Sequence, residues 1–573
     1  MRWIICSKNY QQHFEPENLT GYSTYNFSIF TDVQWLLGKN DKWLVSGNLF
    51  IRNSPVRINC TSSIKMIEGD FHVDDPGFMH NLDGIGTIIR FNDTSFCVSP
   101  DRFGIHKFFY VATQQGFIIS NRLEYITRVL QPKPSKESVL NYVLAFHFTG
   151  GSTFFEGVKY CTPGKSLVFD PSKGLITKTY FDPYQLLQKE RKKIEMQYIT
   201  DTFVRNISNS SQSLNQDQIS LSLTGGADTR NLLAAFLKLN LKPRLYTYGN
   251  SASNDCVKSE IITKSLSLDH TIHDIKITSE LFASTARKIV QLCGGLASIH
   301  RVHRYLAVEQ EAEKSNHMFL GTMGGEFVRG VSEDNYIISP MVYKNWYCSA
   351  IQKERLDEFL LDRFVRTSPD RLETTGSLLS KEPYLSGSAI ERKFAALVFL
   401  TTHLHDAQDI NLYSQLLDGV YAPFLNIDYL ELLFSSQYCF TEKEKSGFLK
   451  RFDNPVFAAE FLKHTYPLLL KFNYSGEHKG SEVLISKYYA AARKSLRKRL
   501  TKRYPPNFPL GSWMQEFVAK NIEPCRDYDV LTEIFDFDAL QKSFEQEKHG
   551  FDEAYWLKYT NPIMMRFILE EFS

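Results

Sequence analysis

Hydrophobic residues follow different patterns before and after about residue 183. In the first part they form short β-type runs, such as 43–46 and 87–90, bounded by Gly, Asn and Asp turn residues. These runs predict a sheet-dominated α+β sandwich over residues 1–182. A charged stretch follows, so we expect residues 183–197 to be a linker.

In the second part, residues 198–573, strand-like and helix-like segments alternate. The predicted segments are a strand over 218–224, a helix over 231–238, a strand over 244–249, a helix over 255–264 and a strand over 271–275. This rhythm predicts a parallel sheet with helices on its faces. From about residue 390 the pattern is mainly helical, so we expect an α/β fold with a helical C-terminal extension.

Composition narrows the class of protein. The chain has 573 residues, of which 43% are hydrophobic and 23% are charged, as in soluble globular proteins. A formal net charge of +2 provides no field suited to nucleic acid. Nine cysteines form no C-x-x-C pair, and there is neither a secretory segment nor a membrane-spanning run. We therefore expect a cytoplasmic protein with reduced thiols and neither nucleic-acid nor membrane partners.

The strongest chemical signal is the segment Thr-Gly-Gly-Ala-Asp-Thr between the first strand and the first helix of the second part. Gly225 and Gly226 let phosphate oxygens approach main-chain N–H groups, and the helix N-terminus faces the anion. Thr224 and Thr229 add hydroxyl donors, and Asp228 provides a carboxylate for Mg²⁺. No Walker lysine follows, which disfavours transfer of a γ-phosphate. The segment predicts a pyrophosphate cradle, and hence cleavage of ATP between its α and β phosphates.

This segment resembles the Ser-Gly-Gly-x-Asp-Ser motif of the PP-loop ATP pyrophosphatases, with Thr in place of both Ser residues. Further segments resemble the glutaminase domain of asparagine synthetases, namely 82–86, 96–110, 117–121 and 153–181. The resemblance covers most of residues 1 to about 440 and indicates the asparagine synthetase superfamily. It implies an Ntn-hydrolase-like sandwich in the first part and an ATP pyrophosphatase domain with amide synthetase activity in the second.

The chain departs from this family at the glutaminase nucleophile. The family has a Cys directly after the initiator Met, where this sequence has Arg2. Cys6 could replace it only after removal of five residues, because the N-terminal amine must act as the base beside its own thiol. Asn121 stands where the family usually has Glu. We therefore expect a degenerate domain without glutaminase activity, in which Cys6 is a buried strand residue.

The resemblance also implies where the rest of ATP and the departing pyrophosphate lie. Adenine is expected against Leu223, Tyr248 and Gly321, at the ends of adjacent strands, although apolar strand ends are equally typical of core. Lys479 is the candidate for the late lysine that neutralises charge on the acyl-adenylate and pyrophosphate. An exposed lysine in a glycine-containing loop is ordinarily only a solvated charge.

The second glycine turn, 321–330, matches the family in part. Gly325 replaces the Asp that would be a second Mg²⁺ ligand, and Thr322 replaces an acidic or Tyr residue. The resemblance implies that Asp228 binds the metal and that the adjacent Glu326 is catalytic if it takes over the lost carboxylate. Without the alignment, a glycine turn with one Glu is more typical of a structural element.

Other features have both structural and functional interpretations. His300 and His303 could bind a metal, but packing or substrate contact is favoured because no third ligand follows a known pattern. Asn426 and Asp409 are expected to be packing or helix-start residues. The basic run over 494–503 predicts a solvated helix face or a dock for an acidic peptide or phosphate group.

Together these features predict an ATP- and Mg²⁺-dependent carboxylate–amine ligase that forms an acyl-adenylate, releases pyrophosphate, and yields an amide and AMP. Because the family's N-terminal Cys is missing, β-lactam synthetases and lasso-peptide cyclases are the closer analogues. The expected partners are a carboxylate substrate and an amine donor, in peptide or secondary-metabolite tailoring. Two alternatives stay open: an asparagine synthase supplied with ammonia or glutamine, and a nucleotide-binding pseudoenzyme.

Overall fold

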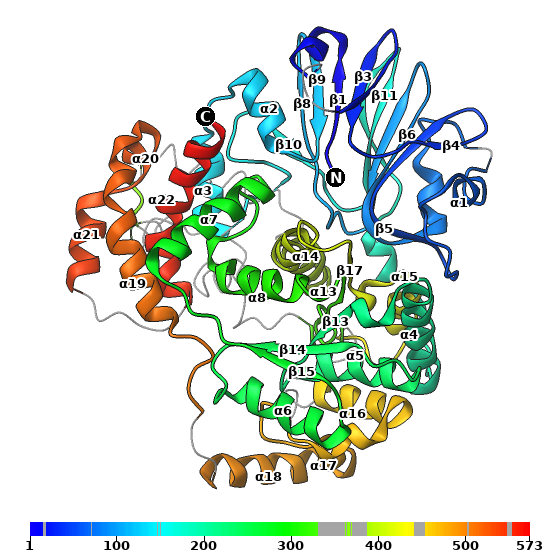
Figure 1. Cartoon of the computed structure of the whole chain (residues 1–573), viewed down its shortest axis with the longest axis vertical. Helices are drawn as coiled ribbons and strands as arrows, with labels where there is room; N and C mark the ends of the chain where they lie inside the picture. The colour runs from blue at the N-terminus through cyan, green and yellow to red at the C-terminus, as the bar shows by residue number, and fades with distance from the viewer. Residues whose placement is uncertain are drawn as a thin grey trace.

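The computed structural model describes most of the chain. The described residues are 1–14, 19–69, 71–145, 147–148, 150–330, 361, 364–366, 368, 387–440, 453–500, 504–546 and 553–573. Two stacked β-sheets occupy one end of the molecule, and a third sheet surrounded by helices occupies the other (Figure 1). Most of the last helices, drawn in orange and red, lie on the left of this view.

The first part of the chain forms two six-stranded antiparallel sheets. One has the strand order β10-β8-β9-β1-β3-β2, with strands β1 (Trp3–Ser7), β2 (Thr20–Ser23), β3 (Phe27–Thr31), β8 (Phe109–Thr113), β9 (Gly116–Ser120) and β10 (Lys159–Tyr160). The other has the order β12-β11-β7-β6-β5-β4, with strands β4 (Leu36–Leu37), β5 (Lys42–Ile51), β6 (Leu82–Phe91), β7 (Phe96–Pro100), β11 (Lys165–Asp170) and β12 (Gly174–Thr179). The helices of this part are η1 (Lys8–His13), α1 (Thr61–Lys65), η2 (Pro76–Asn81), α2 (Leu123–Leu130) and α3 (Lys136–Ala145).

The two sheets pack face to face. Trp3 and Ile5 of β1 share one buried cluster with Ile89 of the opposite sheet. The intervening residues Ile4 and Cys6 belong to the other large cluster, on the outer face of their sheet. Because successive side chains of a strand point to opposite faces, β1 is buried on both sides. The sandwich predicted from the first part of the sequence is confirmed.

The second part contains a five-stranded sheet in which every pair of neighbours is parallel. Its order is β15-β14-β13-β16-β17, with strands β13 (Ile219–Ser222), β14 (Arg244–Tyr248), β15 (His270–His273), β16 (His317–Phe319) and β17 (Gly419–Tyr421). The chain first adds strands on one side of β13 and then returns to the other side. The strand order therefore reverses at β13, and such a reversal leaves a crevice at the carboxyl ends of the strands.

Helices surround this sheet and form the C-terminal region, as predicted. They are η3 (Pro183–Leu186), α4 (Met196–Ser211), η4 (Gln216–Gln218), α5 (Ala227–Lys238), α6 (Asn254–Leu266), α7 (Ser279–Cys293), η5 (Ile299–Arg301), α8 (Val302–Ala312), α9 (Glu326–Arg329), α13 (Ala389–Ala395), η7 (Ala396–Asp406), α14 (Ala407–Tyr413), η8 (Pro423–Leu425), α15 (Ile427–Phe434), α16 (Asp453–Thr465), η11 (Pro467–Lys471), α17 (Gly480–Ile485), α18 (Lys487–Leu500), α19 (Leu510–Asn521), η12 (Glu523–Asp527), α20 (Asp529–Ile534), α21 (Phe537–Gln546) and α22 (Glu553–Phe572). Helix α5, which was predicted over 231–238, starts at Ala227. This is four residues before the predicted start, because the glycine turn leads directly into the helix.

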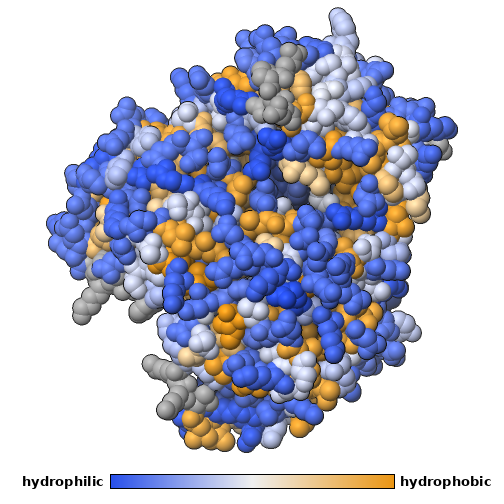
Figure 2. Space-filling view, in the orientation of Figure 1, coloured by the Kyte–Doolittle hydropathy of each residue, from blue (hydrophilic) through white to orange (hydrophobic). Residues whose placement is uncertain are grey.

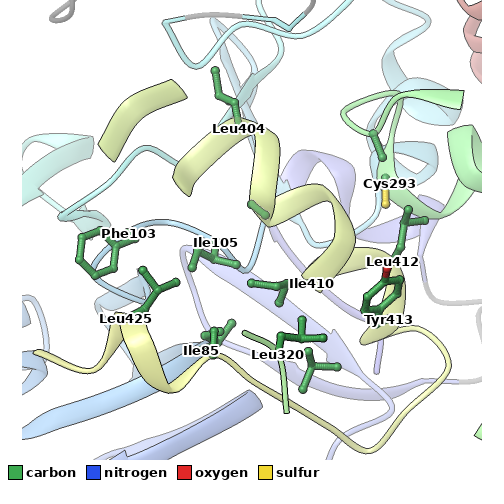
Figure 3. Packing of buried hydrophobic residues seen from close by; sticks show 14 of the residues in the cluster. Ile85, Phe103, Ile105, Cys293, Leu320, Leu404, Ile410, Leu412, Tyr413 and Leu425 are labelled. Atoms are coloured by element: carbon green, nitrogen blue, oxygen red, sulfur yellow. The ribbon is translucent and has the colours of Figure 1, made fainter. Parts of the chain in front are cut away.

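One hydrophobic core runs between the two parts. Figure 3 shows Phe103 and Ile105 of the first part beside Leu425 and Ile410 of the second. All four side chains are buried, and removing such groups from water is the main stabilising contribution at an interface of this kind. Along the sequence, all strands of the first two sheets precede residues 183–197 and all strands of the third sheet follow them. The role of this segment as a linker between separate domains stays a prediction.

The surface is mixed in polarity. The face shown in Figure 2 is mainly hydrophilic, with hydrophobic residues scattered over it. Exposed hydrophobic side chains also occur on α17 and α18, including Ile485, Tyr488 and Leu500. Within the described ranges, no helix combines the length and the hydropathy needed to cross a bilayer.

Candidate functional site

The glycine turn after β13 lies at the carboxyl end of the central strand. Gly226 is the N-cap of α5, so the N–H groups of the first turn of this helix have no intrahelical acceptor. The Gly226 N–H donates to Oγ1 of Thr224 (3.1 Å), and the Thr224 N–H donates to Oγ1 of Thr229 (3.2 Å). The two hydroxyls are 3.2 Å apart. They organise the turn, and both can rotate towards a phosphate oxygen.

Asp228 stands in the first turn of α5. Its Oδ1 atom is buried and has no hydrogen-bond partner among the described residues. Burial, and after it the nearby charge of Glu326, raise the pKa of Asp228 to about 8. A carboxylate without a donor, held beside a second carboxylate, fits a divalent cation. Mg²⁺ takes carboxylate oxygens and would remove the electrostatic penalty of charging this group.

The second glycine turn packs directly on the first. A β-carbon added to Gly324 would lie 2.7 Å from Cβ of Asp228, and one added to Gly321 would lie 3.1 Å from the backbone N of Thr229. Between these glycines, Met323 has a φ of 64°, a left-handed conformation that is rare for a side chain of this size. The close approach of the two turns therefore depends on glycine at two positions and on a strained residue between them.

Glu326 begins the short helix α9 after this turn. It forms an ion pair with Arg329, and its Oε2 accepts a hydrogen bond from the Gly325 N–H (3.2 Å). The structure thus brings Glu326 near Asp228, where its charge affects the pKa of Asp228, while Gly325 contributes only backbone. Gly325 has no carboxylate of its own, and the neighbouring Glu326 places one within electrostatic reach of Asp228.

A third carboxyl, Asp406, joins this group and was missed in the sequence analysis. It ends η7, a π-helix, and burial followed by the charges of Glu326 and Asp409 raises its pKa to about 8. No motif marks residue 406. Its helix is also wound with hydrogen bonds between residues five apart, so α-helical spacing in the sequence does not indicate which side chains share a face. Among the described residues, no three His, Cys, Asp or Glu side chains form a group that could hold a metal. Mg²⁺ at Asp228 would therefore need phosphate or water ligands.

Asp409 is held by two arginines. It accepts hydrogen bonds from Arg304 (2.6 Å) and from Arg301 (3.1 Å). The guanidinium of Arg301 also lies 3.0 Å from Nδ1 of His405. This network ties α8 to α14 next to the carboxyl group of Asp406.

The three residues expected around adenine lie at the carboxyl ends of neighbouring strands. Leu223 follows β13, Tyr248 ends β14, and Gly321 follows β16 two residues after its end. The Leu223 N–H donates to the carbonyl of Tyr246 (2.8 Å), which extends the pairing of β13 and β14. The ring of Tyr248 is stacked with that of Phe508, with centroids 5.8 Å apart. The structure brings these three residues together, and adenine binding by them stays a prediction.

A hairpin between η11 and α17 covers the glycine turn. The Ser475 N–H donates to the carbonyl of Gly225 (2.8 Å). The buried guanidinium of Arg230 donates to the carbonyls of Phe472 (3.0 Å) and Gly225 (3.3 Å), so α5 also holds this hairpin. Lys479 lies at the end of the hairpin, where its N–H binds Oε2 of Glu482 (3.1 Å). The contact with the glycine turn is thus made by Ser475, four residues before the predicted catalytic lysine.

Asp255, at the start of α6, links three segments and was also missed from the sequence. Its Oδ1 accepts hydrogen bonds from the N–H of Gly225 and from the hydroxyl of Ser475, both at 3.1 Å. Its Oδ2 accepts one from the side chain of Asn507, also at 3.1 Å. A carboxylate therefore occupies one of the N–H donors expected to face phosphate. The signal in the sequence was an Asp at a helix start after a strand, which is too common to be specific.

In the first part of the chain, Cys6 is fully buried in β1, as expected from the sequence. Burial raises the pKa of its thiol to about 12, so the reactive thiolate is not populated near neutral pH. Asn121 accepts a hydrogen bond from the Trp3 N–H (3.0 Å) and donates one to the carbonyl of Met1 (2.8 Å). It is an anchor for the N-terminal segment.

The remaining candidates have structural contacts. Nε2 of His300 is 2.8 Å from the hydroxyl of Thr560 in α22, and the ring of His303 lies 4.6 Å from that of Phe508. Asn426 is the N-cap of α15, as the sequence analysis expected. The basic run lies on α18 as far as residue 500, and residues 501–503 lie outside the described part of the chain.

Comparison with known proteins gives little. No family model and no curated protein matches the chain. Among solved structures, one described as the allosteric regulatory enzyme of purine biosynthesis is 9% identical, with a TM-score of 0.21 over 48% of this chain and 74% of that one. A glutamine phosphoribosylpyrophosphate amidotransferase from B. subtilis in complex with ADP and GMP is 7% identical, with a TM-score of 0.17 over 56% of this chain and 75% of that one. Similarities this low carry no argument about function, which must be inferred from the site itself.

Proposed function

We propose that the protein is an ATP-dependent carboxylate–amine ligase that releases pyrophosphate and AMP. The observation that carries the proposal is the buried Oδ1 of Asp228, which has no hydrogen-bond partner in the described part of the chain. It lies in the first turn of α5, at the point where the strand order reverses. A helix N-terminus at such a point is suited to an anion. A carboxylate in the same turn would repel a bound phosphate unless a cation such as Mg²⁺ lies between them.

The residues around the turn account for the chemical steps. A substrate carboxylate attacks the α-phosphate of ATP, and pyrophosphate leaves towards the N-terminus of α5 and the hydroxyls of Thr224 and Thr229. The amine then attacks the acyl carbon, the bond to AMP breaks, and the amine loses a proton. Mg²⁺ bound by Asp228 would neutralise charge on the leaving pyrophosphate. Glu326 and Asp406 adjust the charge around it, and Lys479 stays a candidate for the same anion.

The amine source is proposed to be the second substrate. Cys6 is buried and its thiol is un-ionised near neutral pH, which speaks against this cysteine as a nucleophile towards glutamine. A peptide or secondary metabolite that carries its own amine fits this proposal. Asparagine formation from aspartate and free ammonia uses the same adenylation step and is the nearest alternative.

A second candidate function, nucleotide binding without catalysis, is favoured by one observation. The Gly225 N–H, which a bound pyrophosphate would require, is occupied by the carboxylate of Asp255. If Asp255 stays in place when nucleotide binds, the β phosphate cannot accept the hydrogen bond of the Gly225 N–H, and the carboxylate of Asp255 repels the phosphate. The protein would then be a nucleotide-binding scaffold.

The test is ATP-dependent release of pyrophosphate with Mg²⁺ across a panel of carboxylates that includes aspartate and acidic peptides. The Asp228→Asn variant keeps the size of the side chain and removes its charge. Asp217→Asn, on an exposed aspartate just before β13, is the matched control. Release that needs one carboxylate and is lost only in Asp228→Asn supports the ligase. Tight ATP binding with no release under any condition supports the scaffold, and absence of ATP binding contradicts both.

A further inference from the structure

A C-terminal arm, residues 504–509, lies across the end of β14. The carbonyl of Asn507 accepts a hydrogen bond from the Asn250 N–H (2.8 Å). Its side chain donates to Oδ2 of Asp255 (3.1 Å). Gly249 permits this approach, because its φ is +114° and a β-carbon there would lie 2.9 Å from the carbonyl oxygen of Asn507. Asn507 thus fixes the arm in place through both its main-chain carbonyl and its side chain.

The arm brings an aromatic side chain to the strand end. The ring of Phe508 is stacked on that of Tyr248, with centroids 5.8 Å apart and an interplanar angle of 25°. The rings of His303 and Trp513 lie 4.6 Å and 5.8 Å from it. Phe508 and Tyr248 are only partly buried. This aromatic cluster reaches the surface at the carboxyl end of a parallel strand. Aromatic side chains at such a position are suited to stacking on a ligand.

One carboxylate joins this arm to the glycine turn. Oδ2 of Asp255 binds the arm through Asn507, and its Oδ1 binds the Gly225 N–H. The aromatic cluster and the turn are therefore held in a fixed relation across neighbouring strands β13 and β14. In a parallel α/β sheet a nucleotide binds across neighbouring strand ends, with its phosphates at a helix N-terminus and its base at the next strand end.

We propose that Phe508 is a base-stacking residue, which with Tyr248 and His303 forms the wall of the nucleotide site against the purine ring. The proposal rests on the proposed function, because it assumes that ATP binds at the glycine turn. It adds a specific contact from the C-terminal region, more than 250 residues after β14. Aromatic rings suit this role because they offer a flat apolar face and lose little conformational entropy on binding.

The experiment compares the dissociation constants of ATP, AMP and inorganic pyrophosphate, each with Mg²⁺, for the full-length protein and for Phe508→Leu and Phe508→Trp. Loss of one stacking contact should weaken ATP and AMP about tenfold in Phe508→Leu. Pyrophosphate, which has no base, should bind as before. Phe508→Trp should bind nucleotides about as tightly as the unaltered protein, because its ring can stack in the same way. Phe544→Leu, at another partly buried phenylalanine that packs on Tyr559, controls for a general loss of packing.

The outcomes separate this inference from the proposed function. If the unaltered protein binds no ATP, the proposed function fails and the stacking role fails with it. If it binds ATP but Phe508→Leu binds nucleotides equally well or more tightly, only the stacking role is wrong, and tighter binding would show that Phe508 blocks the site. Equal weakening of pyrophosphate and ATP would make the arm a structural support and would also overturn the inference. Quenching of a 2-aminopurine nucleotide, retained with Trp and reduced with Leu at position 508, reports stacking even if Phe508→Leu is less stable.

Discussion

Gly324 and Asp228 are in contact through the backbone of one and the side chain of the other. A β-carbon on Gly324 would lie 2.7 Å from Cβ and 3.0 Å from Oδ1 of Asp228. The floor of the candidate cation site is therefore a glycine from a different strand end, about 100 residues later in the chain. The position of the Asp228 carboxylate depends on the absence of a side chain there.

We predict that Gly324→Ala reduces pyrophosphate release about 100-fold and lowers the free energy of unfolding by about 1–3 kcal/mol. The added methyl group must displace Asp228, and misplacement of a reacting group by about 1 Å can have an effect of this size. Steady-state kinetics and thermal unfolding would test this. Gly21→Ala is the control, because its β-carbon would make only ordinary contact with Phe30, at 3.4 Å. Unchanged kinetics in Gly324→Ala would contradict the role of this contact.

Without a cation, the contribution of Asp228 to the stability of the protein should fall as pH rises from about 4 to about 8. The pKa of Asp228 is raised to about 8 in the folded state, so the folded state binds more protons than the unfolded state in this window. Asp228→Asn should remove part of the pH dependence and raise the melting temperature at pH 8 in EDTA. Melting curves at pH 5 and pH 8 would show this, with Asp217→Asn as the reference. An equal effect of Asp228→Asn at both pH values would rule out the explanation.

Two histidines, His147 (buried) and His106 (half-buried), predict sensitivity to acid. Burial lowers the pKa of His147 to about 3 and that of His106 to about 4. Both are neutral when folded, so the stability they contribute is present above about pH 6.5 and is lost as pH falls towards these values. His147→Gln should shift the midpoint of acid unfolding to lower pH. His464→Gln, on an exposed histidine, should leave it unchanged, and the prediction is wrong if the two variants behave alike.

Asn426 joins the two parts of the chain by donating to the carboxylate of Asp83 while its own Oδ1 caps α15 through the Tyr429 N–H (3.1 Å). Asn426→Asp would keep the cap but place a second carboxylate against Asp83. Burial already raises the pKa of Asp83. We expect a loss of about 3 kcal/mol in the free energy of unfolding, measured in urea at pH 7.

The comparison for this variant is Asn215→Asp, which changes another capping asparagine, at the exposed N-terminus of η4. It should change the stability little. Equal effects at the two positions would mean that capping, and not repulsion from Asp83, explains the result.

The sequence alone determined the local features of this protein. Alternation of apolar residues predicted β13, and the strand, helix and strand rhythm predicted a parallel sheet, because both patterns depend only on which side of an element is buried. The glycines, hydroxyls and carboxylate of residues 224–229 identified the turn, since each acts within a few residues of the others. The expectation that Cys6 is a buried strand residue followed from its place in the sequence, because five residues would have to be removed before it could stand at the N-terminal position of the nucleophile in the resembled family.

The tertiary structure alone decided which distant groups meet at this turn. Asp255, Asp406 and Ser475 carry no distinctive motif, and each reaches the site from a different helix start, helix end or hairpin. Whether Lys479 or Ser475 touches the turn depends on how the hairpin folds back, which spacing cannot reveal. The pKa of Asp228 depends on a neighbour about 100 residues away. Contacts of this kind arise from packing between elements, so their physical cause is the arrangement of the whole chain and not the pattern of any one segment.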